Sequence, residues 1–158
     1  MAAVDYFLKI DGIEGESQDK THSKEIQLSS WAWGESNQGS MGAGGGGGSG
    51  KVAMQDFHFT MGVNKATPML FLACAQGDHI KSAILTCRKA GKDQQEFLKY
   101  SFFDVFISSY QTGGSEGASE QCSFNFSKIQ VDYKEQKIDG TLAGALTKSY
   151  DLKKQQGT

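Results

Sequence analysis

The sequence predicts a mainly β fold: an antiparallel β-barrel of two packed sheets with one flanking α-helix and a long glycine-rich extended loop. Six or seven short segments alternate apolar and polar residues with the period of a half-buried strand. One further segment carries helix start and stop signals. Twenty glycines and a single proline suggest strands joined by glycine-rich loops. The 158 residues are the size of one ordinary domain, so we treat 1–158 as a single unit.

The expected strands of the N-terminal half are separated by one long loop. Tyr6, Leu8 and Ile10 alternate with Asp5, Phe7 and Lys9, which predicts a short first strand that buries the first set and leaves the second, with Phe7, on the solvent side. A second strand is expected from residue 26 to about residue 34, and a third from 53 to 61. Between them, eight of the fifteen residues in 37–51 are glycine. That segment is too long for a tight turn, so we expect an extended loop with a functional purpose.

The one expected helix is signalled at both ends. Thr67 can accept a hydrogen bond from a free backbone N–H, Pro68 suits the first helical position, and Gly77 suits a left-handed terminator. Asn64 is an alternative N-cap. The helix body, residues 69–75, is apolar on nearly every side. Such a helix must be buried all round, either by its own domain or by a neighbour.

The remaining strands are expected at residues 80–88, 97–109 and 122–133, with a last one around residues 150–152. Within 122–133 the apolar alternation changes phase at Ser127–Lys128. A β-bulge there would keep both sets of apolar side chains inside. Many short strands with long connections indicate an antiparallel barrel or sandwich rather than a parallel α/β sheet.

Composition excludes several functional classes. Lys and Arg together number 16 against 18 Asp and Glu, and Arg88 is the only arginine, which argues against nucleic-acid binding. No stretch of about 18 apolar residues is present and the N-terminus lacks a signal-peptide pattern, so we expect no membrane insertion. The spacing of the three cysteines and three histidines forms no zinc-ligand pair, and we expect no bound metal.

Two motifs match known phosphate-binding and catalytic patterns, but the residues around them do not fit those patterns. Residues 45–51 nearly match the phosphate-binding pattern G-x-x-x-x-G-K-[ST], but Val52 replaces the hydroxyl and a strand, not a helix, is expected to follow. Residues 113–117 match the nucleophile-elbow pattern G-x-S-x-G, but all three histidines precede Ser115 and a strand is again expected next. We therefore expect neither a nucleotide cofactor nor a hydrolase nucleophile.

An ordered set of short motifs, spread from about residue 4 to the final strand, is more specific than either pattern. Its members are Phe7–Ser17, Asp19–His22, Trp31–Gly34, the glycine-rich loop, Lys65–Pro68, Leu72–Cys74 and Arg88–Gly91. In this order they closely resemble the Hcp (haemolysin-coregulated protein) family of the type VI secretion system.

The resemblance implies a structural role. Members of that family are β-barrels with one flanking helix that close into hexameric rings, and the rings stack into a tube that a contractile sheath drives out of a Gram-negative cell. Some members carry effector proteins in the ring lumen. The family's core domain has no catalytic residues and uses no cofactor. Because this chain ends soon after its last strand, we expect no fused effector domain.

The resemblance also implies partners and a location. The expected partners are further copies of the chain, the sheath and spike proteins of the same apparatus and effectors in the lumen, with no nucleic acid and no membrane insertion. We expect the protein in the bacterial cytoplasm during assembly. It would then be secreted to the extracellular space or the target cell without a cleaved signal peptide.

Three sets of residues follow for a tube subunit. Strand alternation places two tryptophans on the core face, which leaves Ser30 and Ala32 facing the lumen if this strand lines it as in similar proteins. Leu70 and Leu72 are assigned to a subunit interface formed by the helix. The ring-stacking loop is assigned to Gly42, Gly44, Gly45, Gly46, Gly47, Gly48 and Gly50.

A hypothesis of another class stands beside this one. A monomeric β-barrel module could bind a glycan or a small apolar ligand in a pocket lined by its aromatic residues. The two hypotheses differ in oligomeric state, because a tube subunit requires a six-fold species and a binding module does not.

Overall fold

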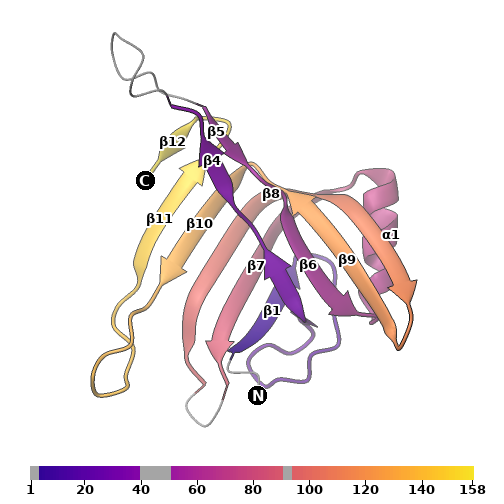
Figure 1. Cartoon of the computed structure of the whole chain (residues 1–158), viewed down its shortest axis with the longest axis horizontal. Helices are drawn as coiled ribbons and strands as arrows, with labels where there is room; N and C mark the ends of the chain where they lie inside the picture. The colour runs from indigo at the N-terminus through magenta and orange to yellow at the C-terminus, as the bar shows by residue number, and fades with distance from the viewer. Residues whose placement is uncertain (1–3, 40–50, 91–93) are drawn as a thin grey trace.

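The computed structural model describes residues 4–39, 51–90 and 94–158, and its strands curl into a barrel-like body with a helix on one side (Figure 1). The glycines assigned to ring stacking, Gly42 to Gly50, lie outside the described residues. The elements are β1 (Val4–Ile10), β2 (Ile26–Gln27), β3 (Ser30–Ala32), β4 (Glu35–Asn37), β5 (Val52–Met54), β6 (Phe57–Gly62), α1 (Thr67–Gln76), β7 (His79–Lys89), β8 (Glu96–Gly114), β9 (Ala118–Asn125), β10 (Lys128–Tyr133), β11 (Leu146–Asp151) and β12 (Gln156–Gly157). The strands pair antiparallel and one helix flanks them in the described part of the chain, which confirms the predicted fold class.

Strand β8 belongs to both layers of the barrel. Its N-terminal part pairs with β7 on one side and β10 on the other, while its C-terminal part, from Phe106, pairs with β9. The sheet runs β12-β11-β10-β8-β7-β1-β2, and a second arm, β9-β6-β3, leaves from the far half of β8. Asp104 has a left-handed φ of 54°, and a register shift lies between Ile107 and Ser109. The two predicted sheets are thus one continuous hydrogen-bonded sheet folded over the core.

The chain passes from one arm of the sheet to the other between β2 and β3. Leu28 donates its backbone N–H to the carbonyl of Tyr6 in β1 at 2.9 Å, and the next residue, Ser29, donates to Thr60 in β6 at 2.9 Å. The predicted second strand is therefore wrong in its extent, because it is two short strands in different arms. The predicted third strand is likewise divided: β5 pairs with β4 in a separate ribbon, and β6 joins the main sheet.

The expected change of phase at Ser127 is present, but it is not a β-bulge. Asn125 opposes Phe106 and Lys128 opposes Phe103, so two residues separate these pairs on each strand. The ladder therefore resumes in the same register after a break that divides β9 from β10. Asp104, the left-handed residue of β8, lies in the two-residue gap opposite this break, and β8 itself continues through it.

Phenylalanines fill the space between the layers. Phe57 and Phe59 of β6, Phe102 of β8 and Phe124 of β9 are at most 1% exposed. The contacting rings among them have centroids 4.9 to 6.2 Å apart, in stacked, tilted and edge arrangements. Such pairs add to the stabilisation from burial of apolar area alone.

Helix α1 forms where it is predicted, but its N-terminus is capped differently. The N-cap is Ala66, which makes no side-chain cap hydrogen bond. The Asn64 side chain accepts from the Ala66 N–H at 2.8 Å, and the Thr67 hydroxyl accepts from the Asn64 N–H at 3.0 Å. The two predicted caps therefore order the turn before the helix. Gly77 ends the helix as predicted, with a left-handed φ of 67° and its N–H donating to Ala73 at 3.0 Å.

Candidate functional site

Strand β3 separates an apolar face from a polar one. Trp31 packs inward, with its ring stacked on Phe57 at a centroid distance of 5.9 Å and tilted against Tyr100 at 5.5 Å. Ser30 and Ala32, on either side of it, are exposed. The predicted division of this strand into a core face and an outward face is confirmed.

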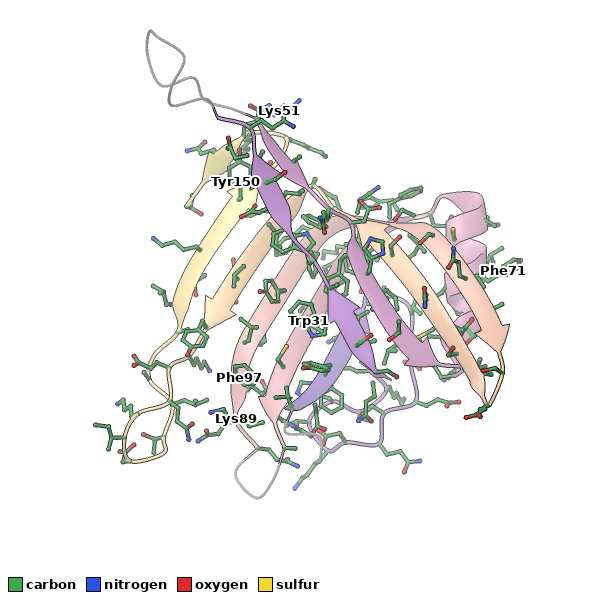
Figure 2. The ribbon with its side chains drawn as sticks, viewed as in Figure 1. Trp31, Lys51, Phe71, Lys89, Phe97 and Tyr150 are labelled. Atoms are coloured by element: carbon green, nitrogen blue, oxygen red, sulfur yellow. The ribbon has the colours of Figure 1, made fainter. Side chains whose placement is uncertain are left out.

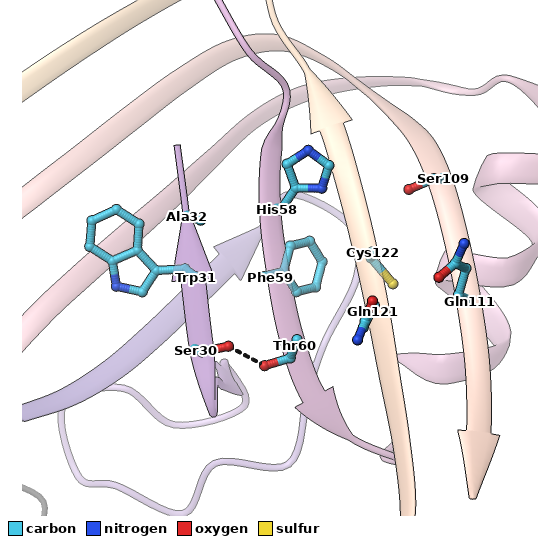
Figure 3. A pocket seen from close by; sticks show the side chains of 10 residues that line it. All are labelled: Ser30, Trp31, Ala32, His58, Phe59, Thr60, Ser109, Gln111, Gln121 and Cys122. Atoms are coloured by element: carbon cyan, nitrogen blue, oxygen red, sulfur yellow. Dashed lines mark hydrogen bonds between the residues drawn. The ribbon is translucent and has the colours of Figure 1, made fainter. Parts of the chain in front are cut away.

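The outward face is hollowed into a shallow depression of about 380 Å³ between β3, β6, β8 and β9 (Figure 3). Five of the ten side chains that line it, all labelled in Figure 3, carry a hydroxyl or an amide. The Ser30 and Thr60 hydroxyls are 2.5 Å apart across neighbouring strands. The polar lining comprises Ser30, Thr60, Ser109, Gln111, Gln121 and the imidazole of His58.

The depression carries little charge. Its described lining contains no carboxylate, ammonium or guanidinium group. Burial raises the pKa of the Cys122 thiol to about 12, so this thiol stays protonated and is no nucleophile at neutral pH. The surface offers donors and acceptors for hydrogen bonds, among them the imidazole of His58.

A serine cluster adjoins this depression through Ser109, and sequence reasoning missed it. The register shift in β8 brings Ser108 and Ser109 onto the same neighbour, Ser123 of β9, with hydroxyl distances of 2.8 and 2.5 Å. Ser108 also donates to the Asp56 carboxylate at 2.6 Å. A bulged strand places two consecutive side chains on one side, and strict alternation cannot anticipate that.

Helix α1 is covered by its own subunit on one side only. Leu70 is 0% exposed and packs in the core, so the prediction that it contacts a neighbouring subunit is wrong. Leu72 is 43% exposed, and Met69 and Phe71 are 48% and 56% exposed. In Figure 2, Phe71 projects at the edge of the molecule. Of the two residues assigned to an interface, Leu72 alone has a surface to offer.

A buried carboxylate attaches this helix to the barrel. Glu120 of β9 is 0% exposed and accepts hydrogen bonds from the Thr67 hydroxyl, in the first turn of α1, and from the Tyr110 hydroxyl of β8. The bond to Glu120, helped by desolvation, raises the pKa of Tyr110 to about 12. Both hydroxyls therefore donate, and the acceptor-only carboxylate is satisfied in the interior.

The segment 14–25 covers the outer face of β1, the face that points away from the barrel core. Arg88 of β7 is 3% exposed and binds both carboxylate oxygens of Asp19 at 2.9 Å, with a further bond to Asp5 at 3.2 Å. Phe7, expected on the solvent side of its strand, is instead 2% exposed, because the guanidinium of Arg88 and the stacked ring of His22 cover it. This cluster fixes a polar segment to the barrel.

Two further observations bear on the kind of site. In the described ranges, no group of three or more His, Cys, Asp or Glu side chains is arranged to hold a metal ion. The described helix is also too short to cross a membrane.

Comparison with known proteins places the chain in a family. Residues 7–133 match the family model described as "Type VI secretion system effector, Hcp". The chain is 49% identical over 150 residues to the protein hcp1 of Pseudomonas aeruginosa, covering 92% of this chain and 93% of that protein.

Solved structures agree with this match. The crystal structure of Hcp1 from Salmonella typhimurium has a TM-score of 0.83 and 37% identity, covering 99% of each chain. A structure described as a type six secretion system protein has a TM-score of 0.91 and 29% identity, covering 99% of this chain and 100% of that one. The family model, the close relative and the shared barrel lead to one conclusion: this chain belongs to the Hcp family of type VI secretion system proteins.

Proposed function

We propose that the chain is the subunit of a hexameric ring, and that these rings stack into the inner tube of a type VI secretion system. The uncovered face of α1 carries this proposal. Large apolar side chains are costly to leave in water, and a ring covers such a surface on every subunit without leaving an end. The six subunits of the ring and the stacking of rings are inferred from the resemblance to the Hcp family.

The polar depression suits the wall of the lumen. A channel that carries effector proteins must hold them weakly enough to let them go. Hydroxyls such as that of Thr60 and amides such as that of Gln121 meet this need, because they hydrogen-bond to water or to cargo at nearly equal free energy. Ala32, next to them, is small and leaves the channel open.

The ribbon β4–β5 suits a role in stacking. It rises from the top of the barrel in Figure 1 and leads into the glycine-rich segment. Glycine loses more backbone freedom than other residues when it is ordered, so these glycines are best used where two backbones must approach closely. We assign Gly42 to Gly50 to contacts with the next ring. The partners of the assembled tube are the sheath and spike proteins of the apparatus. Assembly takes place in the bacterial cytoplasm and secretion follows without a cleaved signal peptide.

Native mass spectrometry at micromolar concentration tests the ring. The wild-type chain is expected to give a six-fold species, and Leu72→Asp monomer or insoluble protein, because a carboxylate would enter an apolar contact. Gln76→Glu, an exposed change on the same helix, is the matched control and is expected to keep the hexamer. A wild-type monomer at every concentration would instead support the monomeric binding module, with the depression as its ligand site.

A separate experiment tests stacking. Replacing Gly44 to Gly48 by alanine is expected to leave the hexamer intact and to abolish both tube formation, seen by electron microscopy, and secretion. Normal secretion by this variant would contradict the assignment and reduce the segment to a linker.

A further inference from the structure

One row of side chains crosses the polar depression from β3 to β8. In an antiparallel sheet, residues directly opposite one another lie on the same side, so the register fixes which side chains share this row. Its members are Ala32, His58, Ser123 and Ser109, on β3, β6, β9 and β8 in turn. Figure 3 shows three of them, Ala32, His58 and Ser109, on their separate strands. The row ends at the serine cluster.

The hydroxyls of that cluster form a chain that ends at a carboxylate. Ser109 lies 2.5 Å from Ser123, Ser123 lies 2.8 Å from Ser108, and Ser108 donates to Asp56 at 2.6 Å. A hydroxyl has one hydrogen, and an ionised carboxylate only accepts. Ser108 uses its hydrogen on Asp56 and therefore accepts from Ser123. Ser123 then accepts from Ser109.

This order leaves Ser109 with lone pairs only for a ligand in the depression. Ser109 lines the depression, whereas Ser123 is 3% exposed, so water does not compete for the hydroxyl in the middle of the chain. Ser108 is the extra residue of the register shift between Ile107 and Ser109, which is why two consecutive serines can meet one neighbour. Hydrogen bonds linked in this way polarise one another.

The carboxylate at the end of the chain has no counter-charge. Among the described residues, no lysine, arginine or histidine forms an ion pair with Asp56. The described lining of the depression contains no ammonium or guanidinium group either. The three aligned hydroxyl dipoles carry the effect of the negative charge to Ser109. A positively charged group that donates N–H bonds therefore complements this end of the depression.

We propose that Ser109, with the hydroxyl chain to Asp56 behind it, binds lysine or arginine side chains of the cargo. Ser109 is the contact residue, while Ser123, Ser108 and Asp56 are positioning residues that fix its oxygen as an acceptor. This inference rests on the proposed lumen wall and names the class of cargo side chain that the wall holds. The contact is open to water, so each one is weak enough to be released.

Neutron diffraction from crystals of the deuterated protein tests the direction of the chain without any cargo. The deuterium of Ser109 is expected to point to Ser123, that of Ser123 to Ser108, and that of Ser108 to Asp56. A Ser109 deuterium that points into the depression would overturn the proposal, whatever the oligomeric state.

Peptide binding to the wild-type protein tests the class of ligand. The probes are acetylated and amidated peptides Gly-Ser-X-Ser-Gly with arginine, glutamine or glutamate at X, and TROSY NMR follows the backbone amides of Ser109 and Ser123. The arginine peptide is expected to bind about threefold more tightly than the glutamine peptide, as for a partly exposed ion pair, and the glutamate peptide most weakly. Equal responses, a strongest response to glutamate or no response to any peptide would refute the assignment.

Two variants separate the charge from the hydroxyl chain. Asp56→Asn removes the charge and keeps the shape, whereas Ser108→Ala keeps the charge and cuts the chain. Both are expected to lose the preference for arginine over glutamine. Ser119→Ala, a change at an exposed serine of β9 outside the depression, is the control and is expected to keep it. A preference retained in both test variants would mean that Ser109 does not depend on the chain.

The same samples distinguish this inference from the proposed function. A wild-type hexamer that lacks the preference for arginine would refute the basic cargo contact and leave the ring standing. A monomeric wild type that shows the preference would refute the ring, and with it cargo as the ligand. Only a hexamer that prefers arginine supports both.

Discussion

The segment 14–25 and helix α1 both cover the outside of the barrel, but they are attached in opposite ways. The polar segment is fixed inside its own subunit by the bonds of Arg88 to Asp19 and Asp5 and by bonds from His22 to Glu25 at 2.9 Å and to Glu96 at 2.5 Å. The apolar helix is anchored on one side and left open on the other. The polar segment finds specific partners within its own chain, whereas the open side of the apolar helix has no such cover in the described residues, and the proposed ring would supply it.

The largest expected effect on this comparison comes from Arg88→Met. The guanidinium is buried, and its loss leaves two carboxylates without their counter-charge. Removal of one partner from a buried ion pair costs about 3 to 5 kcal/mol. Urea unfolding at one fixed subunit concentration should show this loss. Lys81→Met, an exposed change on the same strand, should have little effect, and an equal loss from both variants would mean that the ionic cluster has no special role.

Asp19→Asn should have the next largest effect, about 1.5 to 3 kcal/mol at neutral pH, since it weakens hydrogen bonds to a charged group. The Arg88 guanidinium, with the Thr21 hydroxyl and nearby backbone N–H groups, holds the pKa of Asp19 well below its usual range. The stabilisation is therefore complete above the ordinary pKa of about 3.9 and is lost as pH falls below it.

Unfolding free energies at pH 7, 5, 4 and 3 check this prediction. The difference between wild type and Asp19→Asn should be constant down to about pH 5 and should shrink below pH 4. A difference that stayed constant to pH 3 would contradict the role of the ionised carboxylate.

Helix α1 can be predicted from the sequence, whereas the ionic attachment of segment 14–25 cannot. The alternation in 6–10 and the Thr-Pro and Gly signals around α1 are local, so strand β1 and the helix could be placed from the sequence. The ionic cluster could not, because Arg88 meets Asp19 and Asp5 across 69 and 83 positions of the chain. Only the packing of β1 on β7 brings them together, and the same packing hides Phe7, which alternation alone placed in solvent.

On the outward face of β3, too, only part of the structure can be predicted from the sequence. Ser30 and Ala32 lie on the exposed face that strand alternation predicts for them, because the strand is regular there. The crossing from β2 to β3 was missed, although the inward residues change from even to odd positions between Leu28 and Trp31, a signal that could have marked it. The buried Glu120 gives no local signal, since its partners Thr67 and Tyr110 lie on other elements.

A smaller effect is expected for the helix anchor. Tyr110→Phe removes one of the two hydroxyl donors to Glu120, while Thr67 still donates, and should cost about 1 kcal/mol. Because the pKa of Tyr110 is raised to about 12, its stabilisation is present below the ordinary pKa of about 10 and is lost between pH 10 and 12. Burial also raises the pKa of Tyr100, so ultraviolet absorbance titration of the wild type should show one more late-ionising tyrosine than that of the variant. Ionisation of all five tyrosines near pH 10 would sink this assignment.

The smallest effect should come from Ala32→Gln. The side chain is exposed on the polar depression, so the change adds atoms to open space and should alter the unfolding free energy by less than about 0.5 kcal/mol. Thermal unfolding and native mass spectrometry should match the wild type, with any loss confined to cargo retention. A fall of many degrees in the melting temperature, or dissociation of the hexamer, would mean that Ala32 is packed.

Strand β8 has a further consequence for how the subunit comes apart. Its hydrogen bonds to β7 and β10 lie in one layer of the barrel and those to β9 in the other. Because β8 joins the two layers, neither layer can unfold while the other stays folded. Amide hydrogens in the middle of β8, around Phe102 and Ile107, should exchange with solvent only when the whole subunit unfolds. In the proposed tube, such a subunit would bear a push along the tube axis as a single cooperative unit that either keeps its shape or loses all of it.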